Sequence, residues 1–208
     1  PQVRAAPSPP PPELRAAAEG RLRLMIDPGH GGHDPGARGV GGLWEKDVVL
    51  DISLRLAAKA RAHGGFDVRL TRRTDVFVPL EDRTAAANAF DADLFVSVHA
   101  NAAASPDLNG METYYLNNTD DRATIRLAQM ENGLASATGG AGRGVDVAFI
   151  LSDLVQSYKV EESIDLAEAV QSAAVRRART VRPELRDIGV KAGPFYVLVG
   201  AGMPAVLV

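Results

Sequence analysis

The sequence contains no cysteine among its 208 residues. That absence excludes disulfide bonds, thiolate metal ligands and a cysteine nucleophile. No apolar run approaches the ~18 residues that a membrane span requires, and the net charge is −3 rather than strongly positive. The sequence therefore gives no reason to expect a nucleic acid or an anionic membrane as a partner.

What the sequence does contain is enough apolar material for one globular domain, with 46% hydrophobic and 24% charged residues. Its first stretch, PQVRAAPSPPPP, favours extended polyproline II and is typical of a linker. Since Pro1 is not a natural start, we expect an export signal and an upstream domain before it. We assign residues 1–20 to the linker and 21–208 to the domain.

Strand-like and helix-like segments alternate from residue 21 onward. Apolar runs predict strands at 22–26, 66–70, 93–98, 111–116, 195–199 and 205–208. Helical patterns cover 45–63, 79–90 and most of 120–180, apart from the glycine-rich segment 139–144. In the first of these helices, apolar side chains recur at helical spacing at Val48, Ile52 and Leu56. This alternation predicts an α/β fold, a single domain with a mostly parallel central sheet flanked by helices.

Three residues that can bind a metal adjoin the predicted strand ends. His30 and His99 each follow a predicted strand, and Glu45 opens a predicted helix. Because ligands bind at the carboxyl ends of strands in open α/β sheets, we expect these three side chains to converge. Two imidazoles and one carboxylate are a common catalytic zinc set that leaves a fourth position for water. Zinc lowers the pKa of such a water to about 7, which makes it a nucleophile for carbonyl groups.

Each of these residues also has a plainer explanation. A histidine in a loop is often a hydrogen-bonding surface residue, and Glu45 favours the helix dipole where it stands. Gly31 and Gly32 would permit a sharp turn after His30 and a close approach of substrate to the metal. We interpret His33 and His63 as structural or solvent-facing. Asp27 and Arg83 could orient the ligands or the loop, but a structural salt bridge or turn contact is the interpretation that we favour for each.

Four motifs occur in a specific order and spacing. They are IDPGHGGHDPGARG, WEKDVVLDISLRLA, VRLTRRTDVFVPLEDRTAAAN and DLFVSVHANA. With these motifs the chain, from about Leu22 to Val208, resembles the zinc-dependent N-acetylmuramoyl-L-alanine amidases of the amidase-3 type. The resemblance implies that His30, Glu45 and His99 bind Zn²⁺. It also implies that the substrate is peptidoglycan, cut at the amide between N-acetylmuramic acid and L-alanine.

The segment from about 118 to 180 resembles the insert of the cell-division amidases, in which a helical segment folds over the zinc. The resemblance implies autoinhibition, because a carboxylate from the insert would take the position that an active zinc site keeps open. Glu131, in AQMENG, is our candidate for that carboxylate, with Glu161 and Glu162 as substitutes. The alternative is that Glu131 is a solvated helix residue.

A further amphipathic run, 146–157, suits docking on the core or on a partner. The resemblance implies an activator of the LytM type, itself enzymatically degenerate, that draws the insert away and shifts the closed state toward an open one. We accordingly expect a periplasmic protein that acts in septal cell-wall splitting. The lack of cysteine is compatible with an oxidising compartment.

The amidases of this family carry a glutamate, which acts as general base and acid, directly after the segment that reads MPAVLV here. The chain ends at Val208, so we assign no catalytic residue within 1–208 and expect the 208-residue chain to bind Zn²⁺ but hydrolyse poorly. Asn101, close to His99, is a candidate hydrogen-bond donor to substrate or a loop-stabilising amide.

Two other functional classes stay open. Another zinc amide hydrolase, such as a carboxypeptidase or a deacetylase, would use the same set of two histidines and one carboxylate. A catalytically dead, zinc-bound scaffold or binding module would also fit a chain without the expected glutamate.

Overall fold

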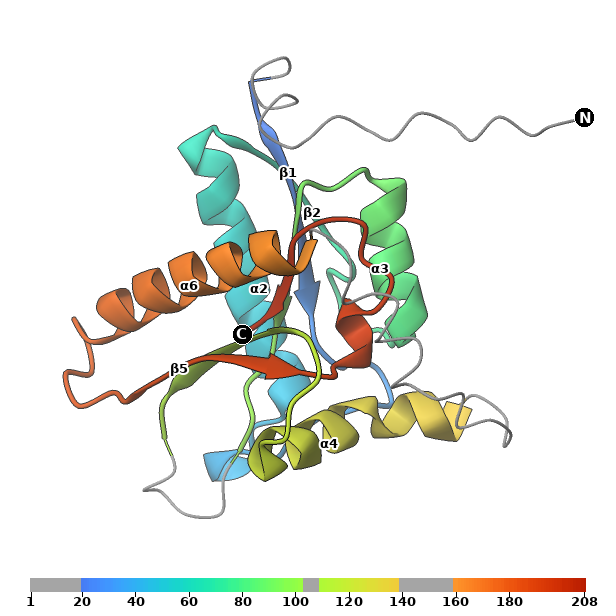
Figure 1. Cartoon of the computed structure of the whole chain (residues 1–208), viewed down its shortest axis with the longest axis vertical. Helices are drawn as coiled ribbons and strands as arrows, with labels where there is room; N and C mark the ends of the chain where they lie inside the picture. The colour runs from blue at the N-terminus through green and yellow to red at the C-terminus, as the bar shows by residue number, and fades with distance from the viewer. Residues whose placement is uncertain (1–19, 103–108, 139–158) are drawn as a thin grey trace, which may run out of the picture.

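A six-stranded sheet forms the centre of the computed structural model, which describes residues 20–102, 109–138 and 159–208 (Figure 1). The strands are β1 (Leu22–Pro28), β2 (Phe66–Leu70), β3 (Leu94–Val98), β4 (Met111–Leu116), β5 (Asp187–Gly193) and β6 (Ala205–Leu207). Their order is β2-β1-β3-β6-β4-β5, and neighbouring strands are parallel except for β4 and β6. The prediction of an α/β fold with a mostly parallel sheet is therefore confirmed.

Helices cover both faces of the sheet (Figure 1). They are α2 (Glu45–His63), α3 (Leu80–Ala89), α4 (Arg122–Thr138) and α6 (Lys159–Ala178), with the short 3-10 helices η1 (Val40–Gly42) and η2 (Tyr196–Leu198). Since side chains alternate along a strand, Leu24 and Ile26 pack on the α2 and α6 face, whereas Met25 packs on the α3, α4 and η2 face. None of the helices in the described ranges is long and apolar enough to cross a membrane.

Helix α2 has its predicted bounds, but its buried side lies one position away from the apolar stripe in the sequence. The buried residues are Glu45, Val49, Ser53 and Ala57. Ile52 and Leu56 of the stripe are instead 44% and 36% exposed. Helix α2 is rotated about its axis so that Glu45 faces the sheet, and this orientation also buries every fourth residue after Glu45. Two of these buried residues, Ser53 and Ala57, have small side chains, which let the helix lie close to the strands.

Two details of the last third differ from the sequence prediction. Segment 195–199, predicted as a strand, contains η2, and its apolar side chains are buried without joining the sheet. The sequence pattern does not predict β5, because its two glycines and mixed polarity give no apolar run. The amphipathic run 146–157 and most of the predicted linker, 1–19, lie outside the described residues.

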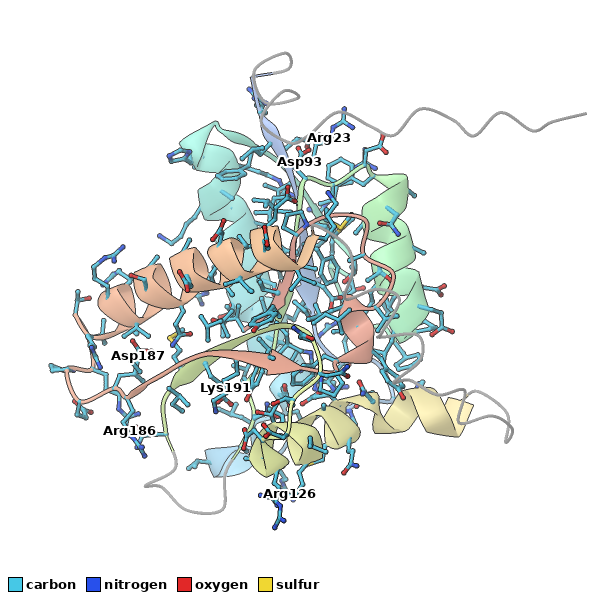
Figure 2. All side chains as sticks on the ribbon, viewed as in Figure 1. Arg23, Asp93, Arg126, Arg186, Asp187 and Lys191 are labelled. Atoms are coloured by element: carbon cyan, nitrogen blue, oxygen red, sulfur yellow. The ribbon has the colours of Figure 1, made fainter. Side chains whose placement is uncertain are left out.

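The two ends of the sheet differ in chemistry. At the amino end, Arg23 and Asp93 lie together (Figure 2), with the Arg23 backbone N–H donating to Asp93 Oδ2 at 2.7 Å. The Asp93 backbone N–H donates to the Arg23 carbonyl at 2.8 Å, which aligns the starts of β1 and β3. The opposite, carboxyl ends of these strands point toward α4 (Figure 1), and the loops there carry the candidate site.

Candidate metal centre

His30, Glu45 and His99 meet at the carboxyl edge of the sheet. His30 follows β1, His99 follows its neighbour β3, and Glu45 is the first residue of α2. Glu45 Oε1 lies 3.1 Å from His30 Nε2 and 3.1 Å from His99 Nδ1. The structure thus brings together the three residues that the sequence analysis singled out, and it does so at the predicted edge.

A fourth side chain, Glu131 of α4, enters the same cluster. Its Oε2 lies 3.2 Å from His99 Nδ1 and 3.4 Å from His30 Nε2. One ligand atom from each of the four residues lies within 4.8 Å of all the others. The side chain of Glu131 is 9% exposed, so in this arrangement it is not a solvated helix residue.

The spacing of these atoms suits a four-coordinate metal. Zinc holds nitrogen and oxygen ligands at about 2.0–2.2 Å in a tetrahedron, which places neighbouring ligand atoms about 3.3–3.6 Å apart. The four separations between carboxylate and imidazole atoms are 3.1, 3.1, 3.2 and 3.4 Å. Two of the converging atoms, His30 Nε2 and Glu131 Oε2, are buried without a hydrogen-bond partner among the described residues. A cation between them would supply what both atoms lack.

Neighbouring side-chain and backbone groups orient His30 and Glu45. His30 Nδ1 lies 2.9 Å from Asp34 Oδ2, an arrangement that leaves Nε2 free to face the cluster. The backbone N–H groups of Ala37 and Ala100 donate to the two oxygens of Glu45, at 2.8 and 2.9 Å. Sequence analysis did not identify Asp34, although its position four residues after His30 in the same loop is a usable signal.

The electrostatics of the cluster favour positive charge at its centre. Burial alone would lower the pKa of His30, but the neighbouring carboxylates of Asp34 and Glu45 outweigh it and raise that pKa to about 9. Burial likewise opposes a charged His99, yet the carboxylates of Glu131 and Glu45 raise its pKa to about 10. Burial would raise the pKa of Glu45, and the two imidazoles hold it well below its usual range. Two carboxylates therefore demand cationic charge, which protons or a metal ion can provide.

The loop after His30 is built for close packing rather than for open access. His30 itself has a φ of 56°, which is unusual for a residue other than glycine. The sequence analysis expected Gly31 and Gly32 to let substrate approach the metal closely. They instead face other backbone atoms, since a Cβ on Gly31 would lie 2.2 Å from the Val76 carbonyl and one on Gly32 2.7 Å from a backbone nitrogen. Their role is to let this loop pack against the segment that follows β2.

The remaining candidates lie outside the cluster. Asn101 lines an apolar groove of about 850 Å³ on the α2 and α6 face. His33 packs on an aromatic ring at a centroid distance of 4.2 Å, and His63 ends α2, as expected of structural residues. Glu161 and Glu162 lie in the first turn of α6 and do not belong to the metal-binding group.

Asp27 and Arg83 form a buried salt bridge with each other, at a distance of 2.9 Å, which is one of the structural contacts that the sequence analysis favoured for them. Arg83 also donates to backbone carbonyls of the His30 loop. Its role is thus wider than the structural contact that the sequence analysis assigned to it.

Little space is left beside the cluster. The cavity there measures about 30 Å³ and is lined by His30, His99, Glu131, Phe77 and Val197, among others. A cavity of this size holds a water molecule or two. With Glu131 in this position, this cavity holds nothing larger.

Fold and cluster together define a class, namely an α/β domain with a potential two-histidine, carboxylate metal site at the carboxyl edge of its sheet. Within that class, the chain belongs to the amidase-3 family, described as N-acetylmuramoyl-L-alanine amidase, whose pattern matches residues 24–208. The resemblance drawn from the sequence motifs is therefore confirmed.

Relatives and solved structures agree with this assignment. The chain is 35% identical over 198 residues to N-acetylmuramoyl-L-alanine amidase AmiC of Escherichia coli O6:H1, covering 93% of this chain and 46% of the relative. It is 38% identical over 191 residues to AmiC of Neisseria meningitidis serogroup B, covering 89% and 44%. The chain thus spans less than half the length of these two relatives. The crystal structure of an N-acetylmuramoyl-L-alanine amidase from Clostridium difficile 630 matches with a TM-score of 0.64 and 29% identity, covering 90% of this chain and 77% of that one.

Proposed function

We propose that this domain is a zinc-dependent peptidoglycan hydrolase that cleaves the amide between N-acetylmuramic acid and the L-alanine of the stem peptide. The observation that carries the proposal is the convergence of His30, Glu45 and His99 at distances that suit zinc, within a member of the amidase-3 family. The protein works outside the cytoplasm, in the periplasm, where its polymeric substrate lies.

In this proposal the chain's own groups hold and orient the reaction centre. When bound, Zn²⁺ would polarise the scissile carbonyl and lower the pKa of a water molecule to about 7. Asp34 keeps His30 in the tautomer whose Nε2 can act as a ligand, and the N–H groups of Ala37 and Ala100 fix the Glu45 carboxylate. These contacts hold the ligands in place before substrate arrives.

The general base and acid stays a prediction. The family resemblance predicts that a glutamate directly follows Val208. The Val208 carbonyl accepts from the His99 backbone N–H at 2.8 Å, and the Val208 N–H donates to the Ser97 carbonyl. A residue that follows Val208 would therefore start beside His99, a proposed ligand.

We further propose that the arrangement with Glu131 is an autoinhibited state. The carboxylate occupies the fourth ligand position, and only about 30 Å³ is open beside it. Asn132, the next residue, ties α4 to the segment around η2, because it donates to the Pro194 carbonyl and accepts from the Tyr196 N–H, both at 2.9 Å. These two contacts stabilise α4 in the closed arrangement.

An activator protein of the degenerate LytM type would supply the opening energy. To convert a population that is 99% closed to one that is 99% open, it must favour the open state by about 5.5 kcal/mol. The AmiC relatives and the inhibitory insert support a place for this switch in septal cell-wall splitting, where hydrolysis must be confined in space.

Digestion of purified peptidoglycan by the whole protein, with activator and Zn²⁺, tests the proposed reaction. The expected products are stem peptides with a free L-alanine amino terminus and glycan strands without peptides. Release of D-alanine or of acetate would instead identify a carboxypeptidase or a deacetylase. Tight Zn²⁺ binding with no product under any condition would identify a scaffold.

A further inference from the structure

The loop that carries His30 is held by cationic side chains at its carbonyl groups. Arg72 donates to the carbonyls of Pro28 and Gly29, at 3.0 and 2.6 Å. Arg83 donates to the carbonyls of Pro28 and His30, at 2.8 and 2.9 Å. Three consecutive carbonyls, ending at the proposed ligand, thus accept from just two guanidinium groups.

A third cation holds the far side of the loop. Lys46 donates to the Gly32 carbonyl at 2.8 Å, and its ammonium also contacts Asp75 at 2.7 Å. The Asp75 carboxylate accepts in turn from the Gly32 backbone N–H at 2.7 Å. These contacts join the loop to α2 and to the segment after β2, but through one carbonyl only.

The two arginines are built into the core. The side chain of Arg83 and the whole of Arg72 are each only 2% exposed. Arg72 also donates to the carbonyls of Thr74 and Lys46, and Arg83 to the Val78 carbonyl and the Asp27 carboxylate. Each guanidinium therefore fixes the His30 loop relative to a second element, which for Arg72 is the start of α2 beside Glu45.

His30 needs such support because its backbone is strained. A φ of 56° costs free energy for a residue with a Cβ and persists only where the surroundings enforce it. Backbone partners hold the loop at the N–H groups of Gly29 and Gly31. The carbonyls of Pro28, Gly29 and His30 accept from the arginines.

We propose that Arg72 and Arg83 are positioning residues that set the affinity of the site for Zn²⁺ by fixing the backbone at His30, an inference that rests on the proposed function. Arginine is required rather than any cation, because a planar guanidinium presents several donors in a rigid fork. A lysine keeps the charge but cannot hold two or three carbonyls in fixed directions.

The variants Arg72→Lys and Arg83→Lys test this inference in the whole protein. The dissociation constant for Zn²⁺ is measured by competition with a chromophoric chelator, and the ligand geometry by the visible absorption of the Co²⁺-substituted protein. We expect each variant to bind Zn²⁺ about 10–100-fold more weakly and to give an altered Co²⁺ spectrum. Arg55→Lys, on the exposed side of α2, is the matched control and should change neither measurement.

Wild-type affinity and an unchanged Co²⁺ spectrum in both folded variants would overturn the inference. If circular dichroism shows that an arginine variant does not fold, Lys46→Met carries the test. We then expect a smaller but measurable loss of Zn²⁺ affinity, and an unchanged value would overturn the role of these cations. Failure of the unsubstituted protein to bind Zn²⁺ would overturn the proposed function as well, which distinguishes the two failures.

Discussion

The carboxylate of Glu131 lies 3.2 Å from Nδ1 of His99, although one residue belongs to α4 and the other follows the central strand β3. This contact places a helix of the insert directly on the proposed metal site. In a zinc site with three protein ligands, the same position would hold water or substrate. Regulation of the site can therefore be tested at a single carboxylate, that of Glu131.

Glu131→Gln should raise basal hydrolysis of peptidoglycan. Glutamine preserves the size of the side chain but replaces an anionic ligand with a neutral one, so the closed state loses stability. A loss of about 1.4 kcal/mol would raise the open population, and with it the rate, about tenfold. Release of dye-labelled peptidoglycan by the whole protein without activator is the measurement. Glu161→Gln, at an exposed position in α6, is the control, and equal rates for both variants would remove Glu131 from the role.

Asn132→Ala should loosen α4 without altering the metal ligands. The substitution removes two hydrogen bonds, each worth about 0.5–1.5 kcal/mol, that tie α4 to the segment around η2. We expect faster hydrogen exchange of α4 amides and higher basal activity, with an unchanged or only modestly changed affinity for Zn²⁺. Arg126→Ala provides the control, because this side chain points away from the sheet (Figure 2). Equal exchange in the two variants would contradict an anchoring role.

Gly36→Ala should weaken Zn²⁺ binding more than it weakens the fold. A Cβ at this position would lie 2.6 Å from His30 Cδ2 and 2.8 Å from Glu45 Oε2, so both side chains must shift. We expect an affinity loss of about 10–100-fold, as for other groups that orient ligands.

Gly64→Ala separates this steric effect from backbone strain. Gly64 caps α2 at a φ of 82°, but its Cβ would meet nothing within 4 Å. The Gly64→Ala substitution should lower the free energy of unfolding by roughly 1–2 kcal/mol and leave Zn²⁺ binding intact. If titration calorimetry gives the same Zn²⁺ affinity for both alanine variants, the close packing around His30 is not what sets that affinity.

Asp27 should make the stability of the protein sensitive to acid. Burial would raise the pKa of this carboxyl, but Arg83 and the hydroxyl groups of Thr71 and Ser97 hold it below its usual value. A lowered pKa contributes stability above the unfolded value of about 3.9, and that contribution is lost as the pH falls through the folded value. The free energy of unfolding, measured in urea, should therefore decrease when the pH is lowered below about 4.

Asp27→Asn isolates this contribution. At pH 7 it leaves Arg83 buried without its counter-charge, so it should cost about 3–5 kcal/mol. The difference from the unsubstituted protein should shrink toward pH 3, because the unfolded Asp27 carboxyl takes up a proton there before the native carboxyl, whose pKa is lowered, does so. A difference that stays constant from pH 7 to pH 3 would show that the ion pair does not determine the acid sensitivity.

Periodicity predicted most of the fold because most elements have simple patterns. Helix α2 and strands β2 and β4 have the predicted bounds. β5 escaped prediction because DIGVKAG, at the edge of the sheet, has no continuous apolar run. Segment 195–199 was wrongly predicted as a strand, since a short buried apolar run does not by itself distinguish a strand from a buried 3-10 turn.

The candidate site could be predicted where chain position implies spatial position. Residues that follow parallel strands share an edge, so His30 and His99 were expected to meet, and the helix start brought Glu45 to them. Arg72 was not identified and Arg83 was interpreted mainly as a structural contact, because both act through hydrogen bonds to backbone carbonyls that no residue pattern records. The placement of Glu131 came from the family resemblance and not from spacing.

The most direct test of the account is an anomalous difference map from crystals of the Zn²⁺-loaded protein, measured on both sides of the zinc absorption edge. The account predicts one strong peak between His30 Nε2, Glu45 Oε1 and His99 Nδ1, with Glu131 Oε2 as the fourth ligand when no activator is present. A peak bound by other residues, or no peak between these side chains, would contradict it.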